Sequence, residues 1–216
     1  MELMNGLRPS GDNRRAFFRA AAISGVALSA GRAAGSEINV FGPVTGYSPQ
    51  IGILVSEMTW MRQAVLAATK GLKPSDLDFL LDEKANRIGA LILHLAATDK
   101  IYQLLTFDNM RVPEVFNSPA FKEWATPMKL GAPARQAIKG HDLDYYLNIL
   151  KETREHTFAE FRKRDDNWLM AVDPKFGWGP TNNLCKWFHV CEHESHHAGQ
   201  ISLIRGRLPG AKVEIG

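Results

Sequence analysis

His189-Val-Cys-Glu-His193-Glu-Ser-His196-His197 is a nine-residue stretch that holds four of the seven histidines in the chain. Residues four apart on an α-helix lie on the same face, about 6 Å from each other. On a helix, therefore, His193 and His197 can direct their imidazoles to one metal ion. We expect the rest of the chain to fold around this pair.

A third ligand must come from elsewhere in the chain, because a metal site needs at least three protein ligands. His94 is the best candidate, since it is the one polar residue in the run Ile88-Gly-Ala-Leu-Ile-Leu-His94-Leu-Ala-Ala. His189 lies one turn before the pair and His196 about 60° from its line, so both are weaker candidates. The sequence thus predicts a divalent metal site made of His94, His193 and His197, a donor set suited to transition ions.

Four long helices are expected from the spacing of apolar residues and from start and stop signals. Ser48-Pro49 is a typical helix start, and Asp142 and Thr181 are expected caps of the third and fourth helices. The predicted ranges are 49–70, 86–107, 142–162 and 181–207. No convincing strand pattern is present, so the predicted fold class is all-α.

Two connections between these helices are rich in aromatic residues. Residues 108–140 include four prolines together with Phe121 and Trp124, which favour a packed lid over a disordered segment. Residues 173–180 form a Gly-rich loop with Phe176 and Trp178. We expect both loops to shape a pocket for an apolar small molecule.

Residues 1–35 are predicted to be a twin-arginine-type signal peptide, with the motif Asn13-Arg14-Arg15-Ala16-Phe17-Phe18-Arg19. The following stretch, 20–31, is too short and too weakly apolar to be a stable membrane anchor. Small residues at 33–36 offer a cleavage site. A basic tail or a misassigned start is the alternative. The prediction implies a periplasmic or otherwise exported protein, with a linker at 36–47 before a domain at 48–216.

The positive net charge belongs to the predicted leader. Of 26 basic and 23 acidic residues in the chain, five and two lie in residues 1–35, which leaves 21 of each in the remainder. A neutral domain lacks the basic surface of a nucleic-acid-binding protein. Cys185 and Cys191 are the two cysteines, and their spacing on one helix excludes a disulfide between them.

The letters from His193 to His197 also match the H-E-x-x-H pattern of zinc proteases, in which the glutamate is the general base. In the best-known versions of that pattern a third ligand follows the second histidine. Here 19 residues follow His197, and Glu214 is the one acidic residue among them. A zinc protease is therefore the less favoured alternative.

The chain resembles the DinB-like (YfiT-like) family of metal-binding four-helix bundles. The resemblance rests on Asn86-Arg-Ile-Gly89 leading to His94, and on His193 and His197 followed by Gly199-Gln200. It implies an up-down-down-up bundle, here with a long connection between the second and third helices. It also implies a divalent ion, zinc or nickel in many members, held by three histidines that match His94, His193 and His197.

Characterised members of that family include S-transferases for low-molecular-weight thiols, such as bacillithiol and mycothiol, and a mycothiol-dependent maleylpyruvate isomerase. Three imidazoles with an open position are typical of sites that lower the pKa of a bound water or thiol. We therefore expect a metal-dependent thiol S-transferase or a hydrolase acting on a small molecule. A non-catalytic metal- or ligand-binding module is the alternative, and a homodimer is one open alternative for its assembly.

Overall fold

The computed structural model describes residues 40–211. The predicted twin-arginine motif and the proposed cleavage site lie outside these residues. Among the residues described, no helix combines the length and the apolar character that crossing a membrane requires.

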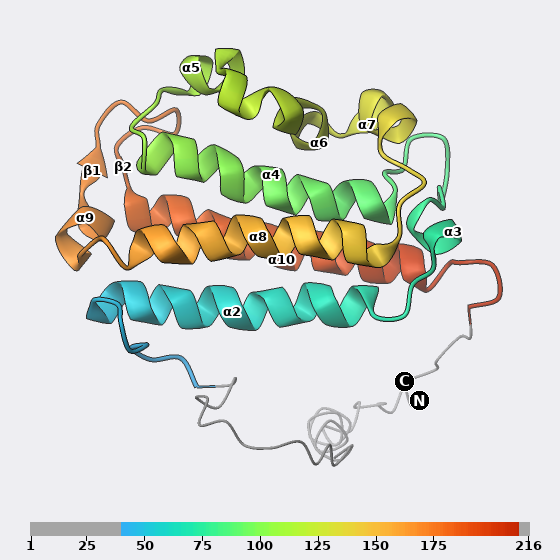
Figure 1. The fold of residues 1–216 in the computed structure, drawn as a ribbon, viewed down its shortest axis with the longest axis horizontal. Coiled ribbons are helices and arrows are strands. Elements are labelled where there is room, and N and C mark those ends of the chain that lie inside the picture. Colours follow the sequence, from blue (N-terminus) through green and yellow to red (C-terminus); the bar gives the residue numbers. More distant parts are fainter. Residues whose placement is uncertain (1–39, 212–216) are drawn as a thin grey trace, which may run out of the picture. The chain divides into compact units, whose positions relative to one another are not determined.

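Four long helices form the bundle, in the order predicted from the sequence. They are α2 (Pro49–Thr69), α4 (Ile88–Thr106), α8 (Leu143–Phe161) and α10 (Asn183–Arg205). In Figure 1, α2 and α10 run in one direction while α4 and α8 run in the opposite direction. This arrangement confirms the up-down-down-up topology. A short helix, α3 (Pro74–Leu77), lies in the connection between α2 and α4.

The start of α2 is capped by a residue far along the chain. Ser48 is at the N-cap position and Pro49 is the first helical residue, as predicted, but the Ser48 side chain accepts no capping hydrogen bond. Instead, Asp166 at the start of α9 (Asp166–Met170) accepts hydrogen bonds from the Ser48 hydroxyl and from the backbone amides of Gln50 and Ile51. An acidic group suits the amide-rich end of a helix.

Nearly every residue of α4 is buried, 17 of its 19. A bundle helix normally keeps one face in water. The face of α4 that the other bundle helices leave uncovered is covered by the connection that follows α4. The connection consists of α5 (Val112–Asn117), the 3₁₀ helix η2 (Pro119–Trp124), α6 (Ala125–Lys129) and α7 (Gly131–Ala137). Figure 1 shows these short helices along α4. Because α4 is covered on all sides, the run of sequence that contains His94 is apolar on every face of the helix.

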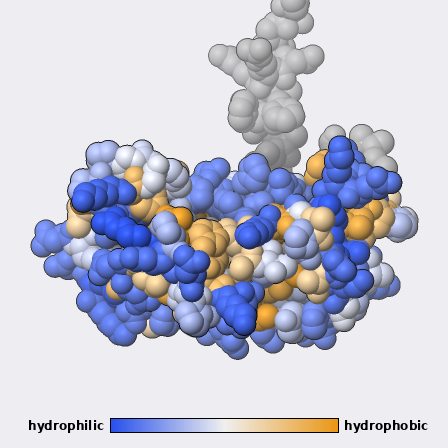
Figure 2. Space-filling view, turned by 90° about the horizontal axis from the view of Figure 1, so that it is seen from above, coloured by the Kyte–Doolittle hydropathy of each residue, from blue (hydrophilic) through white to orange (hydrophobic). Residues whose placement is uncertain are grey.

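The connection is packed, as its aromatic residues predicted. Phe121 is completely buried, and Trp124 packs against both hydrophobic clusters of the core. The Asn86 side chain accepts a hydrogen bond from the amide of Gly131, which ties the start of α4 to α7. Figure 2 views the molecule from this side and shows patches of apolar side chains among mostly hydrophilic ones.

The loop before α10 is a small β-hairpin, which the sequence did not predict. β1 (Val172–Asp173) pairs antiparallel with β2 (Thr181–Asn182). Thr181 is therefore not the helix cap, and that prediction was wrong by one residue. Asn182 occupies the N-cap position, and its side chain accepts a hydrogen bond from the amide of Cys185. Thr181 is buried in the strand pair instead.

A layer of charged residues divides the core of the bundle in two. One hydrophobic cluster includes Ile92, Leu150 and Ile201, and the other includes Met58, Phe161 and Trp187. On each long helix, a buried charged residue lies between the segments that contribute to the two clusters. These residues are Arg62 on α2, Asp99 on α4, Arg154 on α8 and Glu194 on α10.

Candidate metal centre

His94, His193 and His197 meet between α4 and α10. The Nε2 atom of His193 lies 2.8 Å from Nε2 of His94 and 3.1 Å from Nε2 of His197. His94 and His197 are buried, and His193 is half-buried. The structure thus brings together the three histidines that the sequence singled out, one from α4 and two from successive turns of α10.

Hydrogen bonds at the far side of two rings fix how they present their nitrogens. Nδ1 of His94 lies 3.0 Å from the carbonyl oxygen of Pro127. Since a carbonyl only accepts, Nδ1 carries the proton and Nε2 presents a lone pair. Nδ1 of His197 lies 2.8 Å from Oε1 of Gln200, and the same argument applies. These contacts are the outer partners that orient metal-bound histidines.

The geometry fits a single transition ion. Three nitrogens bound to zinc at about 2.0 to 2.1 Å in tetrahedral directions lie about 3.3 Å from each other. The two measured separations, 2.8 and 3.1 Å, are within a few tenths of that value. Without a cation, two lone pairs would face the same nitrogen of His193, and only one proton is available there. The donor set therefore fits a divalent metal.

Burial keeps the three imidazoles neutral. Together with the neighbouring rings of His197 and His94, it lowers the pKa of His193 to about 3. Burial likewise lowers the pKa of His197 to about 4. For His94, burial lowers the pKa while the hydrogen bond to Pro127 opposes that effect. Protons therefore do not compete with a metal for these nitrogens at neutral pH.

His189 and His196 have other surroundings. The Nδ1 atom of His189 lies 3.0 Å from the Tyr102 hydroxyl, and its ring contacts Trp178 of the hairpin loop. His189 also belongs to a second potential ligand group with Glu192 and His193. His196 is exposed and lies 3.2 Å from the amide nitrogen of Gln200. Neither belongs to the group formed by His94, His193 and His197.

Glu194 faces the interior of the bundle. Its Oε1 atom accepts hydrogen bonds from Arg62 at 2.8 Å and from Arg154 at 3.0 Å. Both arginines also contact Asp99, at 3.4 and 3.0 Å, so the four side chains close a ring. A general base in a zinc protease must reach the metal-bound water. Here the H-E-x-x-H glutamate is held between two guanidinium groups in the core, which argues against the protease alternative.

Cys191 is a packing residue. It is buried, and burial raises the pKa of its thiol to about 12. A thiol with so high a pKa is neither a nucleophile nor a ready metal ligand. Cys185 is exposed, and both cysteines are free, as the spacing predicted.

The chain is a four-helix bundle with converging histidines on its second and fourth helices, and its match to a family model places it in the class of DinB-like proteins. Residues 53–210 match the family model described as mycothiol-S-transferase, and the chain belongs to this family. The match covers all four bundle helices except the first turn of α2.

A comparison with solved structures found a protein described as TT2238, a four-helix bundle protein. It is 20% identical, with a TM-score of 0.46, and the match covers 69% of this chain and 96% of that one. A comparison with curated proteins found no match.

Proposed function

We propose that the protein is a divalent-metal-dependent S-transferase, which joins a low-molecular-weight thiol of the mycothiol type to a small electrophile. The observation that carries this proposal is the convergence of three Nε2 atoms, two of them with lone pairs fixed by outer hydrogen bonds. Membership of the mycothiol-S-transferase family supports the choice of a thiol.

In this proposal His94, His193 and His197 hold the ion, with zinc or nickel as the best candidates for an all-imidazole site. A bound divalent ion supplies a Lewis acid that lowers the pKa of a nucleophile at its open position. Pro127 and Gln200 keep the two buried rings in place during the reaction. In the transfer itself the thiol loses its proton, a carbon–sulfur bond forms, and the leaving group departs with the electron pair.

The approach to the site is on the side of His193, the most exposed of the three rings. Beyond it lie His189 and the hairpin aromatics, in a row of ring contacts. The ring centroids are 5.1 Å apart for His193 and His189, 5.1 Å for His189 and Trp178, and 5.0 Å for Trp178 and Phe176. Aromatic walls favour a substrate with an apolar body.

The place of action is part of the same proposal. The twin-arginine motif at Arg14-Arg15 supports export of the folded protein, loaded with its metal in the cytosol, to the periplasm. The neutral charge of residues 36–216 supports a small-molecule partner over a nucleic acid.

The test uses the full chain purified without a histidine tag. Bound metal is measured by mass spectrometry, and turnover is measured with electrophiles in the presence of mycothiol or a simpler thiol. We expect one ion per chain and thiol-dependent turnover. Both should be lost in His94→Ala and His197→Ala but retained in His156→Ala, which removes an exposed histidine of α8.

Each other outcome identifies an alternative. Stoichiometric metal in His94→Ala would contradict the ligand set. Ester hydrolysis without thiol, lost in the same variants, would identify a hydrolase. Metal binding with no turnover on any substrate class would favour a binding module.

A further inference from the structure

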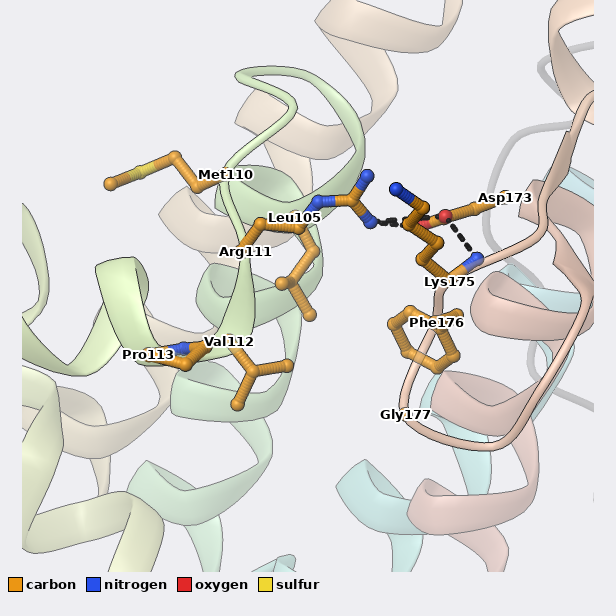
Figure 3. Close-up of a pocket in the computed structure, with 9 residues that line it drawn as sticks. All are labelled: Leu105, Met110, Arg111, Val112, Pro113, Asp173, Lys175, Phe176 and Gly177. Carbon is orange, nitrogen blue, oxygen red and sulfur yellow. Dashed lines mark hydrogen bonds and ion pairs between the residues drawn. The ribbon is translucent and has the colours of Figure 1, made fainter.

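Two adjacent cavities lie beside the β-hairpin. One has a volume of about 180 Å³ and the other about 220 Å³. Their walls share four residues from the end of α4, the start of α5 and β1: Leu105, Met110, Arg111 and Asp173. The ion pair between Arg111 and Asp173 is therefore part of the boundary of both cavities. Figure 3 shows this pair in the wall of the smaller cavity.

Cations outnumber anions in these walls. The Asp173 carboxylate accepts hydrogen bonds from Nη1 of Arg111 at 2.9 and 3.0 Å and from the backbone amide of Lys175 at 3.0 Å. The ammonium of Lys186, on α10, lies 3.5 Å from the same carboxylate. The smaller cavity is lined by Arg111, Lys175 and Asp173, and the larger by Arg111, Lys186 and Asp173. Each wall thus carries two positive charges and one negative charge.

The Asp173 carboxylate does not satisfy all the N–H donors of the Lys186 ammonium. The Lys186 side chain is 3% exposed, so water offers little solvation. Strong ammonium–carboxylate hydrogen bonds are about 2.7 to 2.9 Å long, whereas Asp173 lies at 3.5 Å. The ammonium also lies over the face of the Phe176 ring, at 4.6 Å from the centroid. A buried ammonium with one distant carboxylate is stabilised by a further anionic acceptor.

Phe176 connects these cavities to the histidine cluster. It lines the smaller cavity and begins the row of aromatic rings that ends at His193. A molecule that follows this row has its reacting end at the histidines and its other end near Arg111 and Lys186.

We propose that the two cavities bind the anionic group, a carboxylate or a phosphate, of a small-molecule substrate, with Arg111 and Lys186 as its cationic partners. That the ligand is a substrate rests on the proposed function. The binding of the anion itself does not require the metal. In the free protein Asp173 supplies the negative charge, and an incoming anion competes with it for the two cations.

The test is calorimetric titration of the full chain with inorganic phosphate and, separately, with acetate, which distinguishes the two anions. We expect saturable binding that weakens as salt is added. Arg111→Gln should weaken it by about tenfold or more, the usual effect of losing a charge-assisted hydrogen bond. Lys151→Gln makes the same charge change at an exposed side chain of α8 and should leave the binding of the anion unchanged. Asp173→Asn should strengthen it severalfold, because it removes the competitor.

Because Lys186 is buried, its substitution can unfold the protein, so Lys186→Met is first compared with the parent by thermal unfolding. Arg111 is half-exposed, and Arg111→Gln therefore tests the site without this risk of unfolding. His193→Ala separates the two proposals: it should lose metal and keep phosphate binding. No saturable binding of either anion to the parent, or equal binding in the parent and Arg111→Gln, would overturn the anion site whatever the metal content.

Discussion

The Nδ1 atom of His94 lies 3.0 Å from the carbonyl oxygen of Pro127. His94 belongs to a helix of the bundle, and Pro127 belongs to α6 of the connection that covers this helix. The connection therefore does more than close the core: it holds one ring of the candidate metal centre in a single orientation and sets its protonated nitrogen.

Gln200 has the corresponding role for His197, and its loss is expected to weaken metal binding. Gln200→Leu removes the acceptor at Nδ1, so the ring loses its fixed tautomer. Zinc affinity, measured by competition with a chromophoric chelator, should fall about 10- to 100-fold. Ser202→Ala, an exposed change on the same helix, is the control. Equal affinities of Gln200→Leu and the parent would show that the contact does not position the ring.

Glu194 is expected to affect stability and not metal binding. Glu194→Gln leaves Arg62 and Arg154 facing one remaining carboxylate in the core. Breaking a buried ion pair in this way costs about 3 to 5 kcal/mol in the free energy of unfolding. Urea unfolding measures this loss, and Glu192→Gln on the exposed neighbour should change stability by less than about 0.5 kcal/mol. An unchanged stability together with lost activity would instead favour the protease-like role.

Acid should destabilise the metal-free protein. The pKa values of His193 and His197 are lowered to about 3 and about 4, whereas an unfolded chain has histidines with a pKa of about 6.5. Below this pH the unfolded state binds more protons, so stability is full above about 6.5 and falls toward pH 4. Urea midpoints of the apo protein between pH 7 and pH 5 test this.

The control for this experiment is the double variant His193→Ala with His197→Ala. Its stability should depend less on pH over the same range, because the two groups responsible are absent. Identical pH profiles for the double variant and the apo parent would contradict the assignment.

Gly89 is expected to be required for the contact of α4 with α8. A Cβ atom at this position would lie 2.6 to 2.8 Å from atoms of the Tyr146 ring. Gly89→Ala should therefore destabilise the protein by about 1 to 3 kcal/mol. Gly199→Ala, where a Cβ meets nothing within 4 Å, should instead be neutral or stabilising by up to about 1 kcal/mol.

Tyr146→Leu tests whether the clash is the cause. In that background Gly89→Ala should cost clearly less than in the parent. Additive effects of the two substitutions, measured by thermal unfolding, would place the cost elsewhere.

Export is expected to depend on the paired arginines. An Arg14→Lys, Arg15→Lys variant keeps the charge but removes the motif, so the protein should remain in the cytosol. Cell fractionation followed by immunoblotting measures the amounts of the variant and of the parent protein in the cytosol and the periplasm. Equal amounts of the two in the periplasm would indicate a different route.

The sequence predicted the four long helices because several of their ends carry local signals. Pro49, Asp142 and the Gly71 stop are effects of one or two residues on their own backbone. The second helix was predicted to start at Asn86 and begins at Ile88, because Asn86 bonds Gly131 instead. Such a contact spans 45 residues, and local signals carry no information about it.

The histidine cluster was predictable, and the layer of charges was not recognised. His193 and His197 share a helix, and His94 stood out in an apolar run. Arg62 and Arg154 are charged residues in line with apolar positions of their helices, but the partners of a buried charge lie on other helices. Sequence spacing shows that such a residue is buried and does not show what neutralises it.

The hydrogen bonds from Ser48, Gln50 and Ile51 to Asp166 have a consequence for the maturation of the protein. The first turn of α2 is held by a residue that lies well over 100 positions later in the chain. Residues just upstream of Ser48 also contact this helix: the Gly42 amide donates a hydrogen bond to the Ser56 hydroxyl, and Phe41 meets Trp60 edge to face. A peptidase that cuts before Phe41 therefore leaves these contacts of α2 in place. The bundle can therefore tolerate cuts at varied positions upstream of Phe41 and retain the same first turn.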